Sequence, residues 1–185
     1  ISQKAALDLQ IGQNLVDADV KILKQADQDN RIMTSALKSL SHRPKSESEL
    51  QKKLEEKGFD TEQIKPVMDR LKTHRLIDDS DFAERWVENQ TTFRPRSKKM
   101  LTLELRKKGV AEENISDSLR NLDEEKAAYD CGSKYARRLV RLNWQEFRTK
   151  LSGHLVRRGF SYDLTDRTVR RLWQEIQISD EDQLL

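Results

Sequence analysis

Apolar residues recur along most of this chain at spacings of three and four, which is the period of an amphipathic α-helix. The same apolar pattern returns around Gly58, Gly109 and Gly159, at intervals of roughly fifty residues. Counted from each glycine, the matching residues are Leu50, Leu101 and Leu151 at −8, Leu54, Leu105 and Leu155 at −4, Phe59, Val110 and Phe160 at +1, Met68, Leu119 and Val169 at +10, and Leu71, Leu122 and Leu172 at +13. We infer three tandem copies of one helical unit.

Each glycine predicts a stop between two helices, because glycine readily adopts the positive φ found just past a helix C-terminus. Pro44 and Pro95 hold the same position relative to their glycines, in R-P-K-S and R-P-R-S, and each predicts the end of a preceding helix. The third copy has Gln145 at this place. Helix starts are predicted where a capping side chain stands three residues before Glu or Gln: Ser46 with Glu49, Asp60 with Gln63, and Asn143 with Glu146.

Each copy is therefore predicted to contain three helices. Two of them flank the glycine and the first precedes this pair. The first helices of the three copies are predicted over 33–41, 80–92 and 124–141. No sustained alternation of period two follows residue 30, so the predicted fold is all-α. Residues 17–30 are predicted to be helical, whereas 1–16 fit either the stub of a strand or a short helix. The predicted segments are an N-terminal stub with a leading helix over 1–32, three-helix repeats over 33–78, 79–122 and 123–178, and an acidic tail over 179–185.

Composition adds an expectation about shape and compartment. Of the 185 residues, 35% are apolar and 36% charged, so the core must be thin or divided, and we expect the repeats to form an elongated curved body. One cysteine forms no internal disulfide, and no apolar stretch approaches the length of a membrane span. These features predict a cytosolic protein.

Charge is spread unevenly and leaves the class of partner open. Residues 123–178 carry 12 basic and 8 acidic side chains, whereas residues 179–185 carry three acidic side chains and no basic one. The net charge of +3 is too small to identify a nucleic-acid-binding protein by itself.

Two stretches of sequence resemble a known family. From Leu76 the chain reads L-I-D-D-S-D-F-A-E-R-W-V-E-N-Q, then R-P-R-S and L-T-L-E-L-R-K-K-G-V, and the first copy reads L-S-H-R-P-K-S-E-S-E-L-Q-K-K-L-E-E-K-G-F-D. Together they resemble the RecX family, bacterial regulators of the RecA recombinase, over about residues 15–176. Two features depart from the family pattern: Gln90 stands where many relatives carry Arg, and the N-terminal β-hairpin of longer members is absent or reduced to a stub.

The resemblance implies a curved body of three three-helix units that lies in the helical groove of the RecA nucleoprotein filament. There it would hinder ATP hydrolysis, strand exchange, filament extension and RecA-stimulated repressor cleavage, in DNA repair and the SOS response. It implies no catalysis. We expect a monomer without a cofactor. One alternative is a helical protein that binds DNA directly without sequence preference, and another is a helical adaptor for a different partner.

Two basic clusters are the candidates for contact with a partner. The first places Lys134, Arg137, Arg138 and Arg141 mostly on one face of the helix predicted over 124–141. These residues would contact an acidic RecA surface or DNA phosphate, or would form a solvated face with ion pairs inside the helix. The second cluster surrounds Pro95 in a connector and at a helix start: Arg94, Arg96, Lys98 and Lys99.

Other basic and aromatic residues have simpler interpretations. Asp163 and Asp166 are placed to neutralise Arg167, Arg170 and Arg171. The helix dipole accounts for the cations of the last turns before the glycines, namely Lys57, Lys107, Lys108, Arg157 and Arg158. Trp86, Trp144, Trp173, Phe82, Phe147, Phe59 and Phe160 are predicted to pack in the cores. Phe93 is the aromatic residue expected to be exposed, and Cys131 is expected to be buried or half-buried.

The chain lacks the residue patterns of common catalytic and metal sites. His42, His74 and His154 lie far apart in the sequence, and a single cysteine completes no zinc set. No glycine-rich phosphate loop and no G-x-S-x-G nucleophile turn occurs in the sequence. We therefore expect no catalytic residue and no metal.

Overall fold

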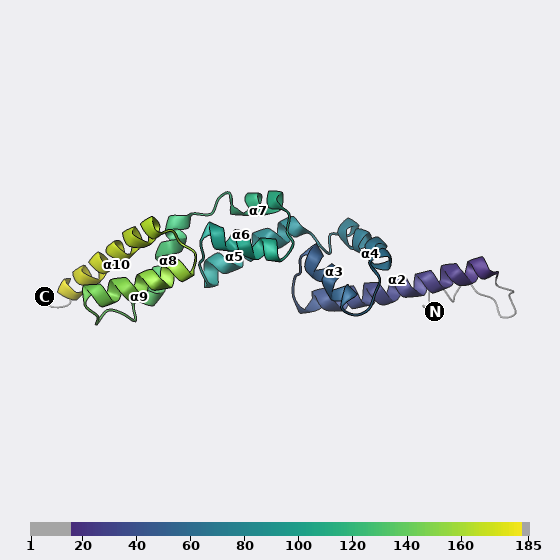
Figure 1. The fold of residues 1–185 in the computed structure, drawn as a ribbon, viewed down its shortest axis with the longest axis horizontal. Helices are drawn as coiled ribbons and strands as arrows, with labels where there is room; N and C mark the ends of the chain where they lie inside the picture. Colours follow the sequence, from purple (N-terminus) through teal and green to yellow (C-terminus); the bar gives the residue numbers. More distant parts are fainter. Residues whose placement is uncertain (1–15, 183–185) are drawn as a thin grey trace. The chain divides into compact units, whose positions relative to one another are not determined.

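The computed structural model describes residues 16–182, and every regular element in that range is an α-helix. The helices, shown in Figure 1, are α2 (Asp17–His42), α3 (Glu47–Glu55), α4 (Thr61–Thr73), α5 (Asp79–Phe93), α6 (Lys98–Lys107), α7 (Glu112–Leu119), α8 (Glu124–Ala136), α9 (Trp144–Arg157) and α10 (Tyr162–Asp182). The all-α prediction is confirmed. The prediction for residues 1–16 lies outside the described residues, apart from Val16 at the start of α2.

The helices form three groups of three, which we name the first triplet (α2–α4), the middle triplet (α5–α7) and the last triplet (α8–α10). By their contacts the residues form two compact units. Among the described residues, one unit contains those up to Phe82 together with Lys108–Val110, and the other contains Ala83–Lys107 and those from Ala111 onward.

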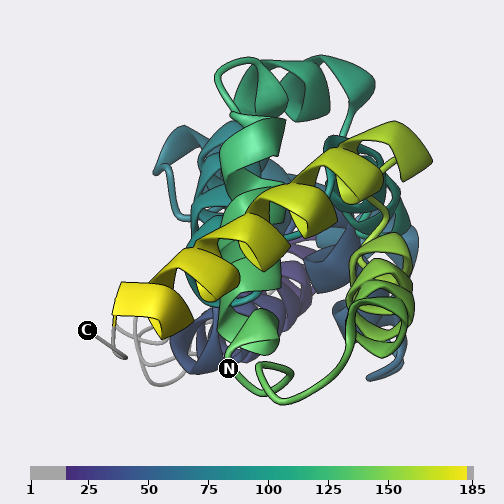
Figure 2. The ribbon, with the colours of Figure 1, turned by 90° about the vertical axis from the view of Figure 1, so that its left-hand side faces the viewer.

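The first and last triplets each enclose an apolar core. In the first triplet, α2, α3 and α4 pack against one another around Ile32, Leu50 and Leu71, none of which is exposed. In the last triplet, α8, α9 and α10 pack together around Phe147 and Leu151, and Figures 1 and 2 show these three helices side by side. The aromatic residues predicted to pack follow this pattern: Phe82, Phe147 and Phe160 are buried, and Phe59, Trp86, Trp144 and Trp173 are half-buried. Among the described residues, no helix combines the length and the apolar character that a membrane crossing requires.

The three glycines occupy the turns that the sequence predicts. Gly58, Gly109 and Gly159 have φ of 84°, 75° and 90°. After α3 the N–H of Phe59 donates to Leu54 O at 3.3 Å, while the N–H of Gly58 donates to Glu55 O at 2.8 Å. These two bonds form a Schellman motif, which satisfies carbonyl groups at the helix end.

Most predicted helix boundaries are confirmed, but α2, α8 and α10 differ from prediction. The side chains of Ser46 and Asn143 accept the expected capping bonds, and helices end before Pro44 and Pro95, but the Asp60 side chain makes no capping bond. Residues 17–30 and 33–41 form one continuous helix, α2, because neither Gly nor Pro interrupts the stretch. At the other end α10 continues to Asp182, into the predicted tail.

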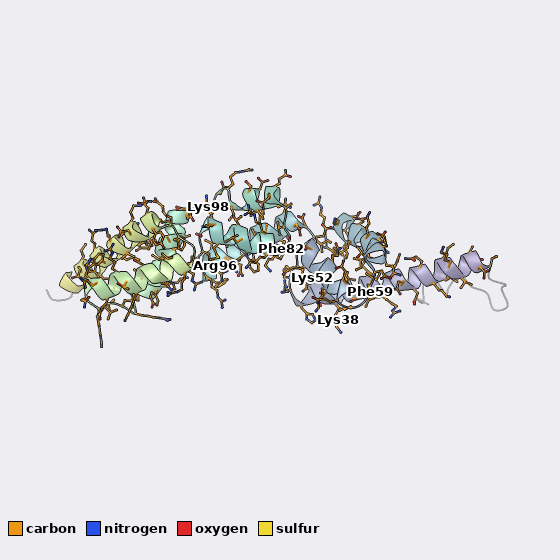
Figure 3. The ribbon with its side chains drawn as sticks, viewed as in Figure 1. Lys38, Lys52, Phe59, Phe82, Arg96 and Lys98 are labelled. Carbon is orange, nitrogen blue, oxygen red and sulfur yellow. The ribbon has the colours of Figure 1, made fainter. Side chains whose placement is uncertain are left out.

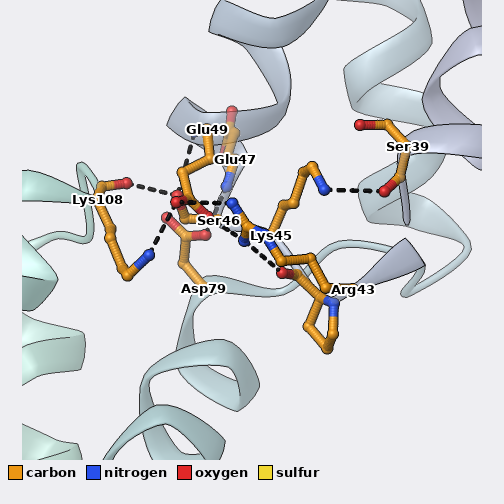
Figure 4. A network of polar contacts seen from close by, with 9 residues as sticks. Ser39, Arg43, Lys45, Ser46, Glu47, Glu49, Asp79 and Lys108 are labelled. Atoms are coloured by element: carbon orange, nitrogen blue, oxygen red, sulfur yellow. Dashed lines mark hydrogen bonds and ion pairs between the residues drawn. The ribbon is translucent and has the colours of Figure 1, made fainter. Parts of the chain in front are cut away.

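The serine of the first R-P-x-S element links the first triplet to the glycine turn of the middle triplet, within one compact unit. Ser46 is fully buried; its hydroxyl caps α3 and donates a hydrogen bond to Lys108 O. A Cβ atom on Gly109 would overlap the side chain of Ser48. The N–H of Glu47 donates to Asp79 Oδ1 at 2.8 Å. We call this arrangement the first joint. Figure 4 shows its polar contacts among Ser46, Glu47, Asp79 and Lys108.

A second joint repeats this arrangement one triplet further along, again within one compact unit. Ser97 is fully buried, and its backbone N–H donates to Arg158 O at 3.1 Å. A Cβ atom on Gly159 would lie 2.5 Å from Ser97 Oγ. The N–H of Lys98 donates to Glu124 Oε1 at 3.0 Å. The R-P-x-S element and the next glycine are therefore the two halves of one joint. A Cβ atom on Gly58, by contrast, would have open space around it.

Candidate functional site

A pocket of about 150 Å³ lies at the second joint and is rich in basic side chains. Arg94 enters it from the connector after α5, Lys134 from the last turn of α8, Arg138 from the segment after α8, and Arg158 from the end of α9. The other lining residues are Phe93, Pro95, Cys131, Tyr135 and His154. Since no lining residue is acidic, the pocket is a candidate site for an anion.

One wall of the pocket is aromatic. The rings of Tyr135 and His154 stack with their centroids 4.4 Å apart and their planes 13° from parallel. Cys131 Sγ lies 3.5 Å from His154 Nε2. At the rim the Phe93 side chain is 70% exposed, so the prediction of an exposed Phe93 is confirmed, as is that of a buried Cys131.

The charges around the pocket alter the pKa values of neighbouring groups. Burial is the main reason why the pKa of His154 is lowered, and Arg158 and Arg157 lower it further. Burial likewise raises the pKa of the Cys131 thiol, although Arg158 and Lys134 act in the opposite direction. The neutral form of the imidazole is therefore favoured, and Arg and Lys side chains supply the positive charge of the pocket.

The predicted helix over 124–141 is wrong in its last part. Helix α8 ends at Ala136, and Arg137 is its C-cap residue. The N–H of Arg137 donates to Ser133 O at 3.4 Å, and the N–H of Arg138 donates to Tyr135 O at 3.0 Å. The chain then bends so that Leu139 is buried and Asn143 caps α9. No Gly or Pro marks this bend, so the local sequence carries no stop signal.

The first basic cluster consequently does not form one helical face. Lys134 and Arg138 line the pocket, whereas Arg137 and Arg141 are exposed outside its lining. Lys134 Nζ also donates to Thr92 O at 3.2 Å, which connects α8 to the end of α5.

The second basic cluster divides in the same way. Arg94 lines the pocket, while Arg96 forms an ion pair with Glu104, whose other oxygen accepts a 3.2 Å hydrogen bond from Trp86. The side chains of Lys98 and Lys99 lie on α6 outside the pocket lining, with Lys99 exposed. Figure 3 labels Arg96, which precedes α6, and Lys98, its first residue. The pocket thus combines Arg94 from one predicted cluster with Lys134 and Arg138 from the other.

Arg158 is the basic residue of the pocket lining that the sequence analysis did not select as a candidate. Its place at the end of α9 has a sufficient explanation in the helix dipole. The register of the repeats carries a further signal. Arg158 stands directly before its glycine, as Lys108 does, and Arg94 holds the same position before Gly109 as Arg43 holds before Gly58.

The arginines of α10 have partners within the last triplet, as predicted. Arg167 pairs with Asp163 at 3.2 Å and Glu125 at 3.0 Å, and Arg170 pairs with Asp166 at 2.7 Å. Arg171 pairs with Glu175 at 2.9 Å and lies over the Tyr129 ring. Among residues 16–178, whose side chains are described, no group of His, Cys, Asp and Glu is arranged to hold a metal ion.

Family models and related sequences match most of the chain. The models described as the first, second and third three-helix domains of RecX match residues 33–71, 78–119 and 123–169. Regulatory protein RecX of Mycobacterium sp. (strain KMS) is 36% identical over 136 residues, covering 69% of this chain and 74% of the relative. Regulatory protein RecX of Clostridium perfringens (strain SM101 / Type A) is 30% identical over 165 residues, covering 86% and 77%.

Solved structures share the fold. A crystal structure of a regulatory protein RecX matches with a TM-score of 0.72 and 24% identity, covering 90% of this chain and 84% of that one. The crystal structure of RecX from Lactobacillus salivarius matches with a TM-score of 0.68 and 25% identity, covering 80% and 97%.

Proposed function

This chain belongs to the RecX family, and we propose that it is a non-enzymatic regulator that binds the RecA nucleoprotein filament and lowers its activity. The affected activities are ATP hydrolysis, strand exchange and filament extension, in DNA repair and the SOS response. The protein acts as a monomer in the cytoplasm. A regulatory role follows from the family; the partner and the direction of the effect are proposed.

The observation that carries this proposal is the tandem repetition of one three-helix domain. A partner that is itself a polymer presents the same surface at regular intervals, so successive domains can each contact one protomer. Linked contacts add through effective concentration, so several weak contacts give strong overall binding. A single domain is therefore expected to bind far more weakly than the chain of three.

The chemistry of the candidate pocket supports a binding role over a catalytic one. Cys131 is its nucleophilic side chain, but burial raises the pKa of the thiol, which disfavours the reactive thiolate. Its neighbour His154 faces two arginines, and no carboxylate is among the lining residues to orient the ring. The basic residues Lys134, Arg137, Arg138, Arg141, Arg94, Arg96, Lys98 and Lys99 are proposed for contact with the filament.

A titration of DNA-stimulated RecA ATPase with this protein tests the proposal. A filament regulator lowers the ATPase rate at concentrations far below those that coat the DNA. A competitor for DNA would act only near saturation of the DNA, and its effect would fall steeply with added salt because its binding releases counterions. Inhibition that requires DNA coating would therefore contradict the proposal.

Reversing the charge of basic residues tests whether they contact the filament. Changing Arg137, Arg138 and Arg141 together to Glu is expected to weaken inhibition roughly tenfold or more, because like charges then face an acidic partner. Helix content, measured by circular dichroism, should be unchanged. The matched control reverses three exposed lysines of α2, Lys21, Lys24 and Lys38, and should inhibit like the parent. Equal inhibition by both triple variants would remove these arginines from the interface.

A further inference from the structure

The second joint lacks a carboxylate that the first joint contains. In the first joint Glu49 accepts hydrogen bonds from Arg43 at 2.9 and 3.2 Å and from Lys108 Nζ at 2.8 Å (Figure 4). Met100 holds the same position before Gly109 as Glu49 holds before Gly58. The set of Arg43, Glu49 and Lys108 is therefore replaced by Arg94, Met100 and Arg158.

Positive charge consequently accumulates at the second joint. The pKa of Arg96 responds to this positive charge: burial lowers it most, and Arg158 and Arg94 lower it further. Lys134 and Arg138 contribute two more cations to the same pocket. Compared with the first joint, the second joint therefore keeps two cations at the same repeat positions, has two further cations, and lacks the carboxylate between them.

We propose that the pocket at the second joint binds a phosphate group of a nucleotide or of a nucleic-acid strand, in the role that the Glu49 carboxylate has in the first joint. Its occupation fixes the last triplet against the connector of the middle triplet, since Arg94 and Pro95 come from that connector and Arg138 and Arg158 from the last triplet. Phosphate binding at this site can be measured without a recombinase, although Arg94, Lys134 and Arg138 are also among the residues proposed to contact the filament.

Two features favour phosphate over a partner's carboxylate. Three guanidinium groups and one ammonium carry more positive charge than one carboxylate neutralises, whereas a phosphate offers more oxygens and up to two negative charges. The exposed Phe93 ring at the rim supplies a surface on which a base can stack, as in proteins that bind single strands.

Thermal unfolding tests the site with inorganic phosphate as the probe and sodium chloride at matched ionic strength as the reference. Phosphate should raise the midpoint of the parent protein more than chloride does. Met100→Glu supplies an internal carboxylate, so its midpoint should no longer respond to phosphate. Arg138→Gln changes an exposed lining residue that carries little packing, and its affinity for phosphate should fall at least about tenfold. Arg137→Gln, one residue away and outside the lining, should behave like the parent.

Nuclear magnetic resonance gives a reading that does not depend on stability. The chain has three histidines, and among them only His154 lines the pocket. Phosphate should shift the side-chain resonances of His154 and leave those of His42 and His74 in place. In Met100→Glu the His154 resonances should not move.

The source of the phosphate is distinguished by comparing thymidine monophosphate with oligothymidylate at equal phosphate concentration. Tighter binding of the oligonucleotide, lost in Met100→Glu, assigns the site to strand phosphates; a preference for the mononucleotide assigns it to a free nucleotide. Equal responses of the parent and Met100→Glu to phosphate would overturn the site. Equal stabilisation by polyglutamate at matched charge would overturn its assignment to phosphate.

Discussion

The first and second joints share a similar arrangement of serine, glycine turn and helix start, but they differ in whether a carboxylate neutralises their cations. In each, a buried serine lies against the glycine turn of the next triplet, and a backbone N–H at the start of the following helix bonds to an acidic side chain. At the first joint Glu49 neutralises the cations, whereas at the second joint arginines face one another. A repeat can therefore keep its packing while one substitution changes a structural ion pair into a candidate ligand site.

The largest expected loss of stability comes from replacing a glycine that lies inside a joint, compared with one that lies outside. Gly109→Val places a β-branched side chain at a φ of 75° and against Ser48. Backbone strain of about 1–2 kcal/mol and overpacking of about 1–3 kcal/mol should together lower the free energy of unfolding by about 3 kcal/mol. Denaturant titration measures this loss. Gly58→Ala, where space is open, should lose only the strain contribution, and equal losses would show that the joint does not discriminate between the glycines.

Replacing the buried serine of either joint with alanine should cause an intermediate loss of stability, and the loss should differ between the two joints. Ser97→Ala removes a helix cap and should cost about 1 kcal/mol. Ser46→Ala also removes the hydroxyl that donates to Lys108 O, so it should cost about 2 kcal/mol. The two hydroxyls contribute differently, because the second joint closes through the backbone N–H of Ser97. Denaturant titrations that rank the two variants the other way would contradict this difference.

The effect expected over the narrowest range of conditions is a pH dependence of stability specific to the first joint. Burial alone raises the pKa of Glu49, but hydrogen bonds from Arg43 and Lys108 outweigh it and lower the pKa to about 2. The folded state therefore binds the proton less readily than the unfolded state. The resulting stabilisation is full above the ordinary pKa of 4.5 and is lost as pH falls toward about 2.

Glu49→Gln should remove this contribution and flatten the loss of stability over that pH window. Thermal midpoints measured in steps from pH 5 to about 2 provide the comparison. Glu56→Gln is a suitable control, since that carboxyl is on the surface and pairs with Lys53 of its own turn. An unchanged acid profile for Glu49→Gln would show that the ion pairs of the first joint do not stabilise the folded state.

Much of the fold was predictable from sequence because its signals are local. The positive φ of Gly58, Gly109 and Gly159 follows from a helix stop that only the chain nearby determines. The caps at Ser46 and Asn143 are equally local. The end of α8 at Ala136 was not predictable, because the bend is produced by burial of Leu139 against the last triplet and not by a Gly or Pro.

The candidate site was predictable only in part. The sequence alone determined the residue types, the repeat register and the replacement of Glu49 by Met100. The tertiary structure decided that Arg94, Lys134, Arg138 and Arg158 line one pocket, although they come from separate parts of the sequence. Local periodicity reports which face of a helix is apolar, but a site built from a connector and two helix ends depends on how helices pack, and packing is a property of the whole fold.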